Sequence, residues 1–449
     1  MNRRTGLVAL LIADTIAALG IRMSVVAVPW LVLVMTDSPV KMGIAAGAEM
    51  VLYVLSSVFA TPLADRFGLW RTSIYTDVGS AAALAAVALI PGLDFVTLIL
   101  LVSVMGAMRG VGDRAKHVLL RPMAELADVP MIRVTSLYEG MTRAAILLGA
   151  PLGGVLIYWW SAPLVVGFTG LTFAAGVLLV GVFVRPPAEE PSEAAEPKEP
   201  YLVALRGGVR ALAQDRLLVT MTVILFASNL FTQAAVVVFV PLWVRDVVHT
   251  PAALGLVGGA FALGVVLGSL VFTFLSTRIP QYLAFTLGAI LGGAPRLLVL
   301  GLSDSLTVVM VVTLLSGIAM CSVNPVYGAA LYKRVPAALQ TRVFGLVTAV
   351  CFAGIPIGGL LAGWAVPGIG LTTTILVFGV VFLAVSLIPL FGFRGRDPLG
   401  VVVKAGAGGT AVAAGEEPEV VDAAAPETGE PVAPGAGGPV AGERAVSAP

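Results

Sequence analysis

Charged residues are scarce in this chain: aspartate, glutamate, lysine and arginine together make up 12% of its 449 residues. A soluble domain is typically about a quarter charged, so this chain lacks the side chains that would cover a water-exposed surface. The formal net charge of +1 gives no indication of a nucleic acid or of an acidic partner. We therefore expect neither an ordinary soluble domain nor a nucleic-acid partner.

Cysteine and histidine are also rare, with two residues of each type. Cys321 and Cys351 lie in apolar runs and are expected to be small core residues, not a disulfide or a metal site. His117 and His249 fall at the ends of apolar segments, where we expect surface positions. Gly110-Val111-Gly112 lies inside an apolar segment and is no phosphate loop. The sequence thus favours a protein that is not an enzyme and holds no cofactor or metal.

Long apolar runs dominate instead. Hydrophobic residues form 58% of the chain and the mean hydropathy is +0.99, which indicates that lipid surrounds most of it. A helix needs roughly 20 apolar residues to cross about 30 Å of hydrocarbon, and inside lipid the backbone must satisfy its own hydrogen bonds. Twelve segments qualify: 7–35, 42–62, 72–91, 95–117, 134–158, 163–184, 217–244, 253–276, 281–302, 306–330, 341–365 and 370–393. The prediction is an all-α membrane protein with twelve transmembrane helices in two pseudo-symmetric six-helix halves.

Positive charge predicts the orientation of these helices, because lysine and arginine accumulate on the cytoplasmic side of a membrane. One side would carry essentially Lys41 and Arg245. The other side would carry Arg3, Arg4, Arg66, Arg71, Arg114, Lys116, Arg121, Arg133, Arg185, Lys198, Arg206, Arg210, Arg278, Lys333, Arg334, Arg342, Arg394 and Arg396. We expect a multi-pass protein of the bacterial plasma membrane with both termini in the cytoplasm and an uncleaved first helix.

Two segments outside the apolar runs differ in composition. Residues 186–200 read PPAEEPSEAAEPKEP, an acidic and proline-rich stretch that has no core-forming pattern. Beyond Arg394 the chain is rich in glycine, alanine, proline and glutamate. The expected organisation is an N-terminal six-helix bundle at 1–185, a cytoplasmic linker at 186–215, a C-terminal six-helix bundle at 216–394 and a disordered cytoplasmic tail at 395–449.

A cluster of glycines around a proline occurs in the fifth span and again in the eleventh. The copies read Gly149-Ala150-Pro151-Leu152-Gly153-Gly154 and Gly354-Ile355-Pro356-Ile357-Gly358-Gly359. Glycine lets helices approach backbone to backbone, and proline removes a helical hydrogen bond. Their equivalent positions predict a duplicated protein whose halves move against each other, as in a secondary transporter. The alternative is helix packing without motion.

The loop between the second and third spans reads Leu63-Ala64-Asp65-Arg66-Phe67-Gly68-Leu69-Trp70-Arg71. With the six-plus-six helices and the doubled glycine cluster, it resembles the major facilitator superfamily over roughly residues 5–394. Thr61 replaces the first glycine of that family's signature, and Leu69-Trp70 displace its basic pair. The resemblance implies a cytoplasmic gate made by Asp65, Arg66, Gly68 and Arg71, in which an acid caps a helix and pairs with arginine.

The fifth-span cluster is similar to the signature of the exporting members of this superfamily, although Ala150 separates its glycine from its proline. Asn324-Pro325, Val335-Pro336 and Arg342-Val343-Phe344-Gly345 look like the macrolide-efflux and enterobactin-exporter branch. The resemblance implies a transporter that exports small molecules by alternating access.

Ionisable residues within the predicted spans are candidates for function, since a charge at a helix centre costs about 2.5–3.5 kcal/mol on insertion scales. Asp14 and Arg22 lie on a similar face of the first span, and Glu49 lies in the second. Arg109 and Asp113 form an i,i+4 pair in the fourth span, where the resemblance implies an arginine involved in proton coupling. We expect these five residues to be proton-coupling candidates, with Asp14 and Glu49 as the protonatable groups. The alternatives are helix packing, snorkelling of Glu49 and a self-neutralising ion pair.

Other polar residues in the spans allow two interpretations. Glu139 and Arg143 form a second i,i+4 pair, which we interpret as a lock between span ends. The candidates for a substrate cavity in the second half are Asn229, Gln233, Arg296 and Asn324. The amides among them would bind substrate or hold neighbouring helices together.

These features favour a secondary active transporter that couples proton entry to the export of small amphipathic molecules. Its expected partners are a small-molecule substrate, the proton as coupling ion and the lipid bilayer, and we expect a monomer. Alternatives on the same fold are a siderophore or metabolite exporter and a solute importer. An alternative of another class is a non-transporting membrane sensor or scaffold that docks through its tail.

Overall fold

The computed structural model describes residues 3–59, 67–185, 209–210, 212–276 and 278–392. The chain divides into a unit at Met1–Val403, which contains all described residues, and a second unit at Lys404–Pro449. The expected linker and tail lie almost entirely outside the described residues, so the predicted domain boundaries stay predictions.

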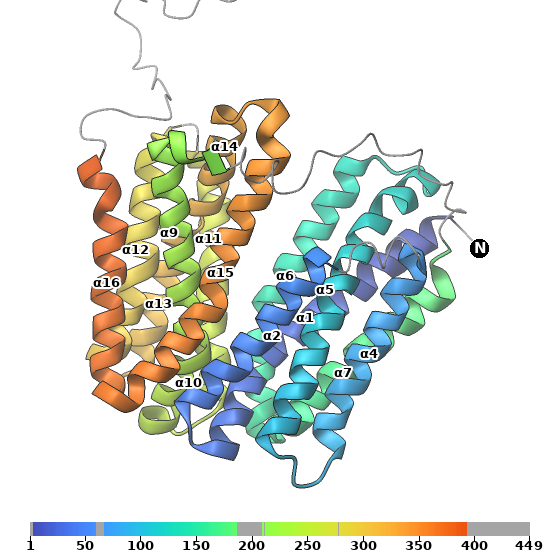
Figure 1. Cartoon of the computed structure of the whole chain (residues 1–449), viewed down its shortest axis with the longest axis horizontal. Helices are drawn as coiled ribbons and strands as arrows, with labels where there is room; N and C mark the ends of the chain where they lie inside the picture. The colour runs from blue at the N-terminus through green and yellow to red at the C-terminus, as the bar shows by residue number, and fades with distance from the viewer. Residues whose placement is uncertain (1–2, 60–66, 186–208, 211, 277, 393–449) are drawn as a thin grey trace, which may run out of the picture. The chain divides into compact units, whose positions relative to one another are not determined.

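The described residues form helices, twelve of which are long and apolar enough to span a membrane. The first half consists of α1 (Arg3–Thr36), α2 (Pro39–Phe59), α4 (Leu69–Leu89), α5 (Phe95–Leu126), α6 (Met131–Trp159) and α7 (Ala162–Phe183). The second half consists of α9 (Arg216–Ala234), η1 (Ala235–Phe239), α10 (Val240–Trp243), η2 (Val244–Val248), α11 (Ala252–Leu275), α12 (Gln281–Leu302), α13 (Leu306–Met320), α14 (Val323–Arg334), α15 (Ala337–Ile369) and α16 (Leu371–Gly392). The predicted all-α membrane fold with twelve spans is confirmed (Figure 1).

Two spans differ from their predicted form. The fourth, expected at 95–117, continues as α5 to Leu126. Helical hydrogen bonds join residues four apart, so a helix can continue beyond its apolar stretch. The tenth, expected at 306–330, is interrupted between Met320 and Val323. Pro325 lies in the first turn of α14, where the absence of an N–H loses no helical hydrogen bond.

Aspartate caps begin one helix in each half. Asp94 accepts hydrogen bonds from the backbone of Val96 and Thr97 at the start of α5, and Asp215 does the same for Leu217 and Leu218 at the start of α9. The hydrogen bond from the Thr97 hydroxyl, with the backbone bonds, lowers the pKa of Asp94. Both caps satisfy N–H groups that the first helical turn leaves unpaired.

The apolar core is divided at one end of the bundle and shared at the other. Near the start of α1, the first half has its own core around Leu10 and Leu120, and the second half has its own core around Met221 and Phe285. Towards the end of α1, a single cluster joins both halves. In Figure 1, α2 and α15 lie side by side near α10.

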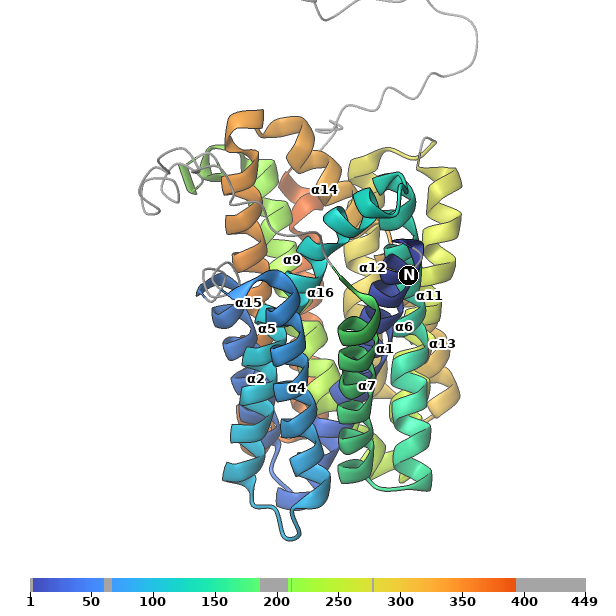
Figure 2. The same ribbon diagram turned by 90° about the vertical axis from the view of Figure 1, so that its right-hand side faces the viewer.

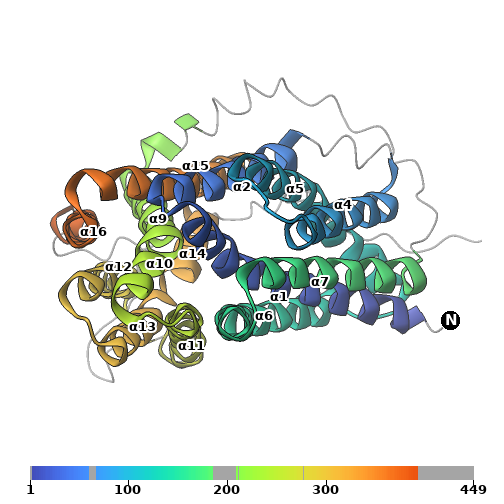
Figure 3. The same cartoon turned by 90° about the horizontal axis from the view of Figure 1, so that it is seen from below.

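Two pairs of helices make most of the contact between the halves: α2 packs against α15, and α6 packs against α11 (Figure 3). Within the first half, α1 packs against α6 and α7 (Figure 2). These pairings place the two predicted glycine clusters, in α6 and α15, at the boundary between the halves.

The two glycine clusters make equivalent contacts. Gly149 and Gly153 pack α6 against α1, and Gly354 and Gly358 pack α15 against α9. The remaining glycines, Gly154 and Gly359, lie against Gly255 and Gly43 of the other half. Pro151 contacts Gly259 of α11, and Pro356 is half-buried in α15. Each cluster therefore faces its own half and the opposite half at once; motion at these joints stays a prediction.

Candidate transport site

Arg109 of α5 joins two of the predicted carboxylates. Its guanidinium donates a hydrogen bond of 3.0 Å to Glu49 of α2, and its Nε lies 3.5 Å from a carboxylate oxygen of Asp113. The ring of Tyr53 lies 4.5 Å from the guanidinium carbon. Arg109 and Glu49 expose only 13% and 21% of their side chains, so water screens this pair weakly.

The close approach of α5 to α2 depends on Gly106. A Cβ at this position would overlap the backbone of Glu49, so a larger residue would separate the two helices. The glycine thus brings Arg109, which follows it on α5, within reach of the Glu49 carboxylate.

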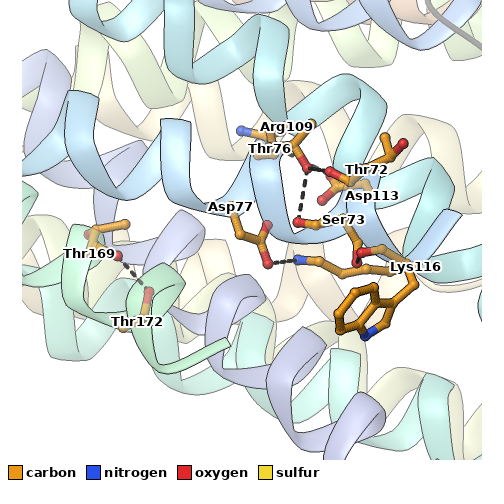
Figure 4. Close-up of polar contacts among 10 residues, drawn as sticks. Thr72, Ser73, Thr76, Asp77, Arg109, Asp113, Lys116, Thr169 and Thr172 are labelled. Carbon is orange, nitrogen blue, oxygen red and sulfur yellow. Dashed lines mark hydrogen bonds and ion pairs between the residues drawn. The ribbon is translucent and has the colours of Figure 1, made fainter. Parts of the chain in front are cut away.

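A second ion pair lies deeper in the first half and was missed in the sequence. The ammonium of Lys116 lies 2.8 Å from the carboxylate of Asp77 in α4, and both side chains are buried (Figure 4). Thr76 borders the pair, and the ring of Phe173 lies 5.9 Å from the ammonium. Lys116 was counted among the positive charges of the cytoplasmic side, and this assignment stays a prediction. Its burial against Asp77 of α4 and near Phe173 of α7 was not predicted. Asp77 could have been found as an acid inside the predicted span 72–91.

Asp14 of α1 belongs to the same region. It interacts with Tyr138 and with the charges of Lys116 and Asp113. Since Arg109, Asp113 and Lys116 follow each other at spacings of four and three residues, they lie on one face of α5. We call Asp14, Glu49, Asp77, Arg109, Asp113 and Lys116 the N-half charge cluster.

Arg22 does not pair with Asp14. It is exposed and interacts electrostatically with Arg109 and Tyr53. Counting Arg22 with the N-half charge cluster gives four carboxyl groups and three basic groups. At least one carboxyl group therefore has no fixed cation of its own in the cluster, and a proton would neutralise it.

A cavity of about 250 Å³ lies between the two halves, and Arg22 and Arg296 are among its lining residues. Its walls come from α1 and α6 of the first half and from α9 to α13 of the second half. Ala235 and Val236 of the π-helical segment η1 also line it. Such π-helical turns are frequent at functional sites, and this one had no signal in the sequence.

Arg296 is the predicted cavity residue that lines this cavity. It is 7% exposed, donates a hydrogen bond to the hydroxyl of Thr232 and lies with its guanidinium carbon 4.6 Å from the ring centroid of Phe261. The other three candidates lie elsewhere. Asn229 donates to the carbonyl of Cys351 at 3.0 Å, which joins α9 to α15, Gln233 is half-buried and Asn324 is exposed. Their role in substrate binding stays a prediction.

The predicted gate is only partly described. Gly68 precedes α4 with a φ of 80°, a conformation that favours glycine, and Arg71 is exposed in the first turn of α4. Asp65 and Arg66 lie outside the described residues, so the gate stays a prediction. The interpreted lock is also weak: Glu139 and Arg143 are exposed and 3.9 Å apart, although Arg143 also donates to Ser269 of α11.

Two six-helix halves that enclose a cavity with buried charges beside it define a membrane transporter. The sequence model of the Major Facilitator Superfamily matches residues 10–250 and 222–421. The chain belongs to the Major Facilitator Superfamily. This confirms the family resemblance and the two-half architecture.

Similar proteins include multidrug efflux pumps called Tap. The pump of Mycobacterium tuberculosis (strain H37Rv) is 26% identical over 388 residues, which cover 85% of this chain and 92% of the pump. The Tap pump of Mycolicibacterium fortuitum is 26% identical over 407 residues, 88% of this chain and 98% of the pump.

Two solved structures share the fold. The nucleoside transporter NupG superposes with a TM-score of 0.71 at 11% identity, and the match covers 88% of this chain and 100% of NupG. A bacterial homologue of the human lysosomal transporter Spinster, in an inward-facing and unoccupied conformation, gives a TM-score of 0.67 at 14% identity, covering 87% of this chain and 96% of its own.

Proposed function

We propose that this protein is a proton-coupled exporter of small amphipathic molecules in the bacterial plasma membrane, working by alternating access. The observation that supports this proposal most is the N-half charge cluster, in which carboxyl groups outnumber basic groups. It lies beside Arg22, which lines the cavity between the two halves. The multidrug efflux pumps that match most of the chain support export as the direction.

Proton coupling would centre on Glu49 and Arg109. Protonation of Glu49 would remove the negative charge that lies 3.0 Å from Arg109. The guanidinium would then keep Asp113 as its countercharge and would still be repelled by Arg22. Protonation of Glu49 would thereby change the charge around Arg109 and its neighbour Arg22, which lines the cavity. Asp14 is the second protonatable group, through its interactions with Lys116 and Tyr138.

Alternating access would use the shared core as one closed gate. The halves meet where Asp37 of the α1–α2 loop pairs with Arg245 of η2, and they have separate cores at the other end. With the termini in the cytoplasm, as the distribution of positive charge favours, this conformation opens toward the cytoplasm. An exporter loads its substrate from that side.

An efflux assay tests the proposal. We would express the chain in a pump-deficient bacterial host and measure the accumulation of ethidium, N-phenyl-1-naphthylamine and 8-anilino-1-naphthalenesulfonate, a cationic, a neutral and an anionic probe. At least one probe should accumulate less than in cells with empty vector, and a protonophore should abolish the difference. If all three probes accumulate to the same level as in cells with empty vector, export is contradicted.

The same assay separates a transporter from a scaffold that docks through its tail. A chain that lacks residues 400–449 should still export its substrate, because the charge cluster and the cavity lie within the described helices. Loss of all activity on this deletion, with normal membrane insertion, would favour the scaffold.

A further inference from the structure

The charged side chains that line the cavity of about 250 Å³ between the two halves are both positive. Among the described residues that line it, the two ionisable ones are Arg22 from the first half and Arg296 from the second. We propose that it binds an organic anion: a compact apolar body that carries one carboxylate or sulfonate, held between the two arginines. This inference rests on the proposed function and names the class of its substrate.

Arg296 gives the stronger evidence for an anion site. Among the described residues, no carboxylate lies within ion-pair distance of it. Its partners are the Thr232 hydroxyl and the Phe261 ring, and its Nε has no hydrogen-bond partner among the described groups. A charge buried within membrane spans is costly unless it is paired. A bound anion would supply the missing countercharge.

Arg109 is a second buried arginine of this chain, and its countercharges can be compared with those of Arg296. Its guanidinium has Glu49 at 3.0 Å and Asp113 at 3.5 Å, so its charge is compensated by the protein. Arg296, equally enclosed, is uncompensated by the residues that the structure describes. The difference indicates that the charge of Arg296 is directed to something that enters the cavity.

Arg22 extends the positive site across the boundary between the halves. It is exposed, and the fixed charge with which it interacts is the cation Arg109. An anion between Arg22 and Arg296 would therefore interact with both halves. Binding would favour the arrangement in which the two arginines approach each other, which couples occupancy to the relative position of the halves.

The rest of the lining selects the body of the ligand. Most other lining residues are apolar, among them Val25, Val257, Phe261 and Leu300, and the cavity holds about 250 Å³. Such a space fits a bicyclic aromatic acid, with the ring against the apolar wall and the acid at the guanidinium groups. An amphipathic cation of the same shape would meet two like charges in a poorly screened space.

Equilibrium dialysis tests the proposal without any ion gradient. The full chain in lipid nanodiscs would be dialysed against radiolabelled 1-naphthaleneacetate, its neutral amide and 2-(1-naphthyl)ethylammonium, which share one aromatic body. We expect the acetate to bind at least about tenfold more tightly than the amide, a preference of about 1.4 kcal/mol, and the ammonium to bind more weakly than both.

The variants assign this preference to the arginines. R296Q and R22Q should each reduce acetate binding and leave amide binding unchanged, which also reports that the variant is folded. R296K should keep most of the preference, and R121Q, which removes an exposed arginine at the end of α5, should change nothing. If R296Q does not fold, R296K and R22Q carry the test, since Arg22 is exposed.

Three results would overturn the inference. The first is an ammonium that binds as tightly as the acetate, and the second is the absence of acetate binding at millimolar concentration. The third is a preference for the acetate that is unchanged in R296Q, or in R22Q if R296Q does not fold. Its failure differs from failure of the proposed function. Gradient-driven efflux of a cation or neutral compound without anion preference contradicts only the anion site. Anion binding without any gradient-driven transport contradicts only the exporter.

Discussion

The carboxylate of Asp77 lies 2.8 Å from the ammonium of Lys116, and fewer than one twentieth of either side chain is exposed. The pair joins α4 to α5 in the interior of the first half (Figure 4). A buried pair of this kind contributes little net stability over apolar residues of similar size, but it is costly to break.

Lys116→Met should therefore destabilise the protein by about 3–5 kcal/mol, because it leaves the Asp77 carboxylate buried without its partner. Adding Asp77→Leu should recover most of this loss, since the double variant buries no charge. Thermal unfolding of the detergent-solubilised protein, followed by size-exclusion chromatography, measures both effects. Arg121→Gln breaks an exposed pair and should leave the unfolding temperature unchanged. A double variant as unstable as Lys116→Met would contradict this account.

Gly43 of α2 lies against the backbone of Gly359 in α15 and permits the contact between the halves. Gly43→Leu should disfavour this contact by about 1–3 kcal/mol, the usual cost of overpacking. A cysteine at Ala235, which lines the cavity, would report the change in a chain without its native cysteines. Its reaction with an impermeant maleimide added on the side of the α1–α2 loop should become at least about fivefold faster.

Gly140→Leu is the matched control, because no atom lies within 4 Å of a Cβ built at Gly140. This variant should react at the rate of the parent protein. If Gly43→Leu also leaves the rate unchanged, the contact between α2 and α15 does not close that side of the cavity.

The ion pair of Asp37 with Arg245 crosses the same boundary but is exposed to solvent. Asp37→Asn should raise the maleimide rate by less than about fivefold, because exposed pairs are weak. Asparagine tolerates the φ of 46° at this position, so the loop is kept. The effect should disappear near 1 M salt, where charges are screened beyond about 3 Å.

Asp246→Asn controls for this variant, since Asp246 pairs with the same Arg245 within the second half. It should leave the maleimide rate unchanged. An equal effect of both variants, or an effect that persists in high salt, would show that the pair across the boundary is not responsible.

The fold could be predicted from the sequence because its determinants are local. Apolar length defines each span, and the repeated cluster around Pro151 and Pro356 marks equivalent helices of the two halves. The positions at which helices end were harder to predict. Lys116 lies at the end of the predicted fourth span, but α5 continues to Leu126 and Lys116 is buried against Asp77 of α4.

The site could be predicted less completely, because it depends on contacts between distant residues. Arg109 and Asp113 are neighbours on one helix turn, so their pairing follows from spacing. The bond to Glu49 spans 60 residues, and the pairing of Asp77 with Lys116 needs the packing of two helices. Asn229 shows the converse: an amide inside a span looked available to substrate, and it donates to the carbonyl of Cys351.

Proton movement that depends on substrate, measured in proteoliposomes with a pH-sensitive dye, tests the central claim most directly. Glu49→Gln and Asp14→Asn remove the two proposed protonatable groups, and Glu125→Gln removes an exposed carboxylate at the end of α5 as a control. With a substrate identified in the efflux assay, Glu125→Gln should release protons as the parent protein does. We predict that Glu49→Gln or Asp14→Asn abolishes proton release while substrate still binds. Normal proton release by both variants would contradict the account.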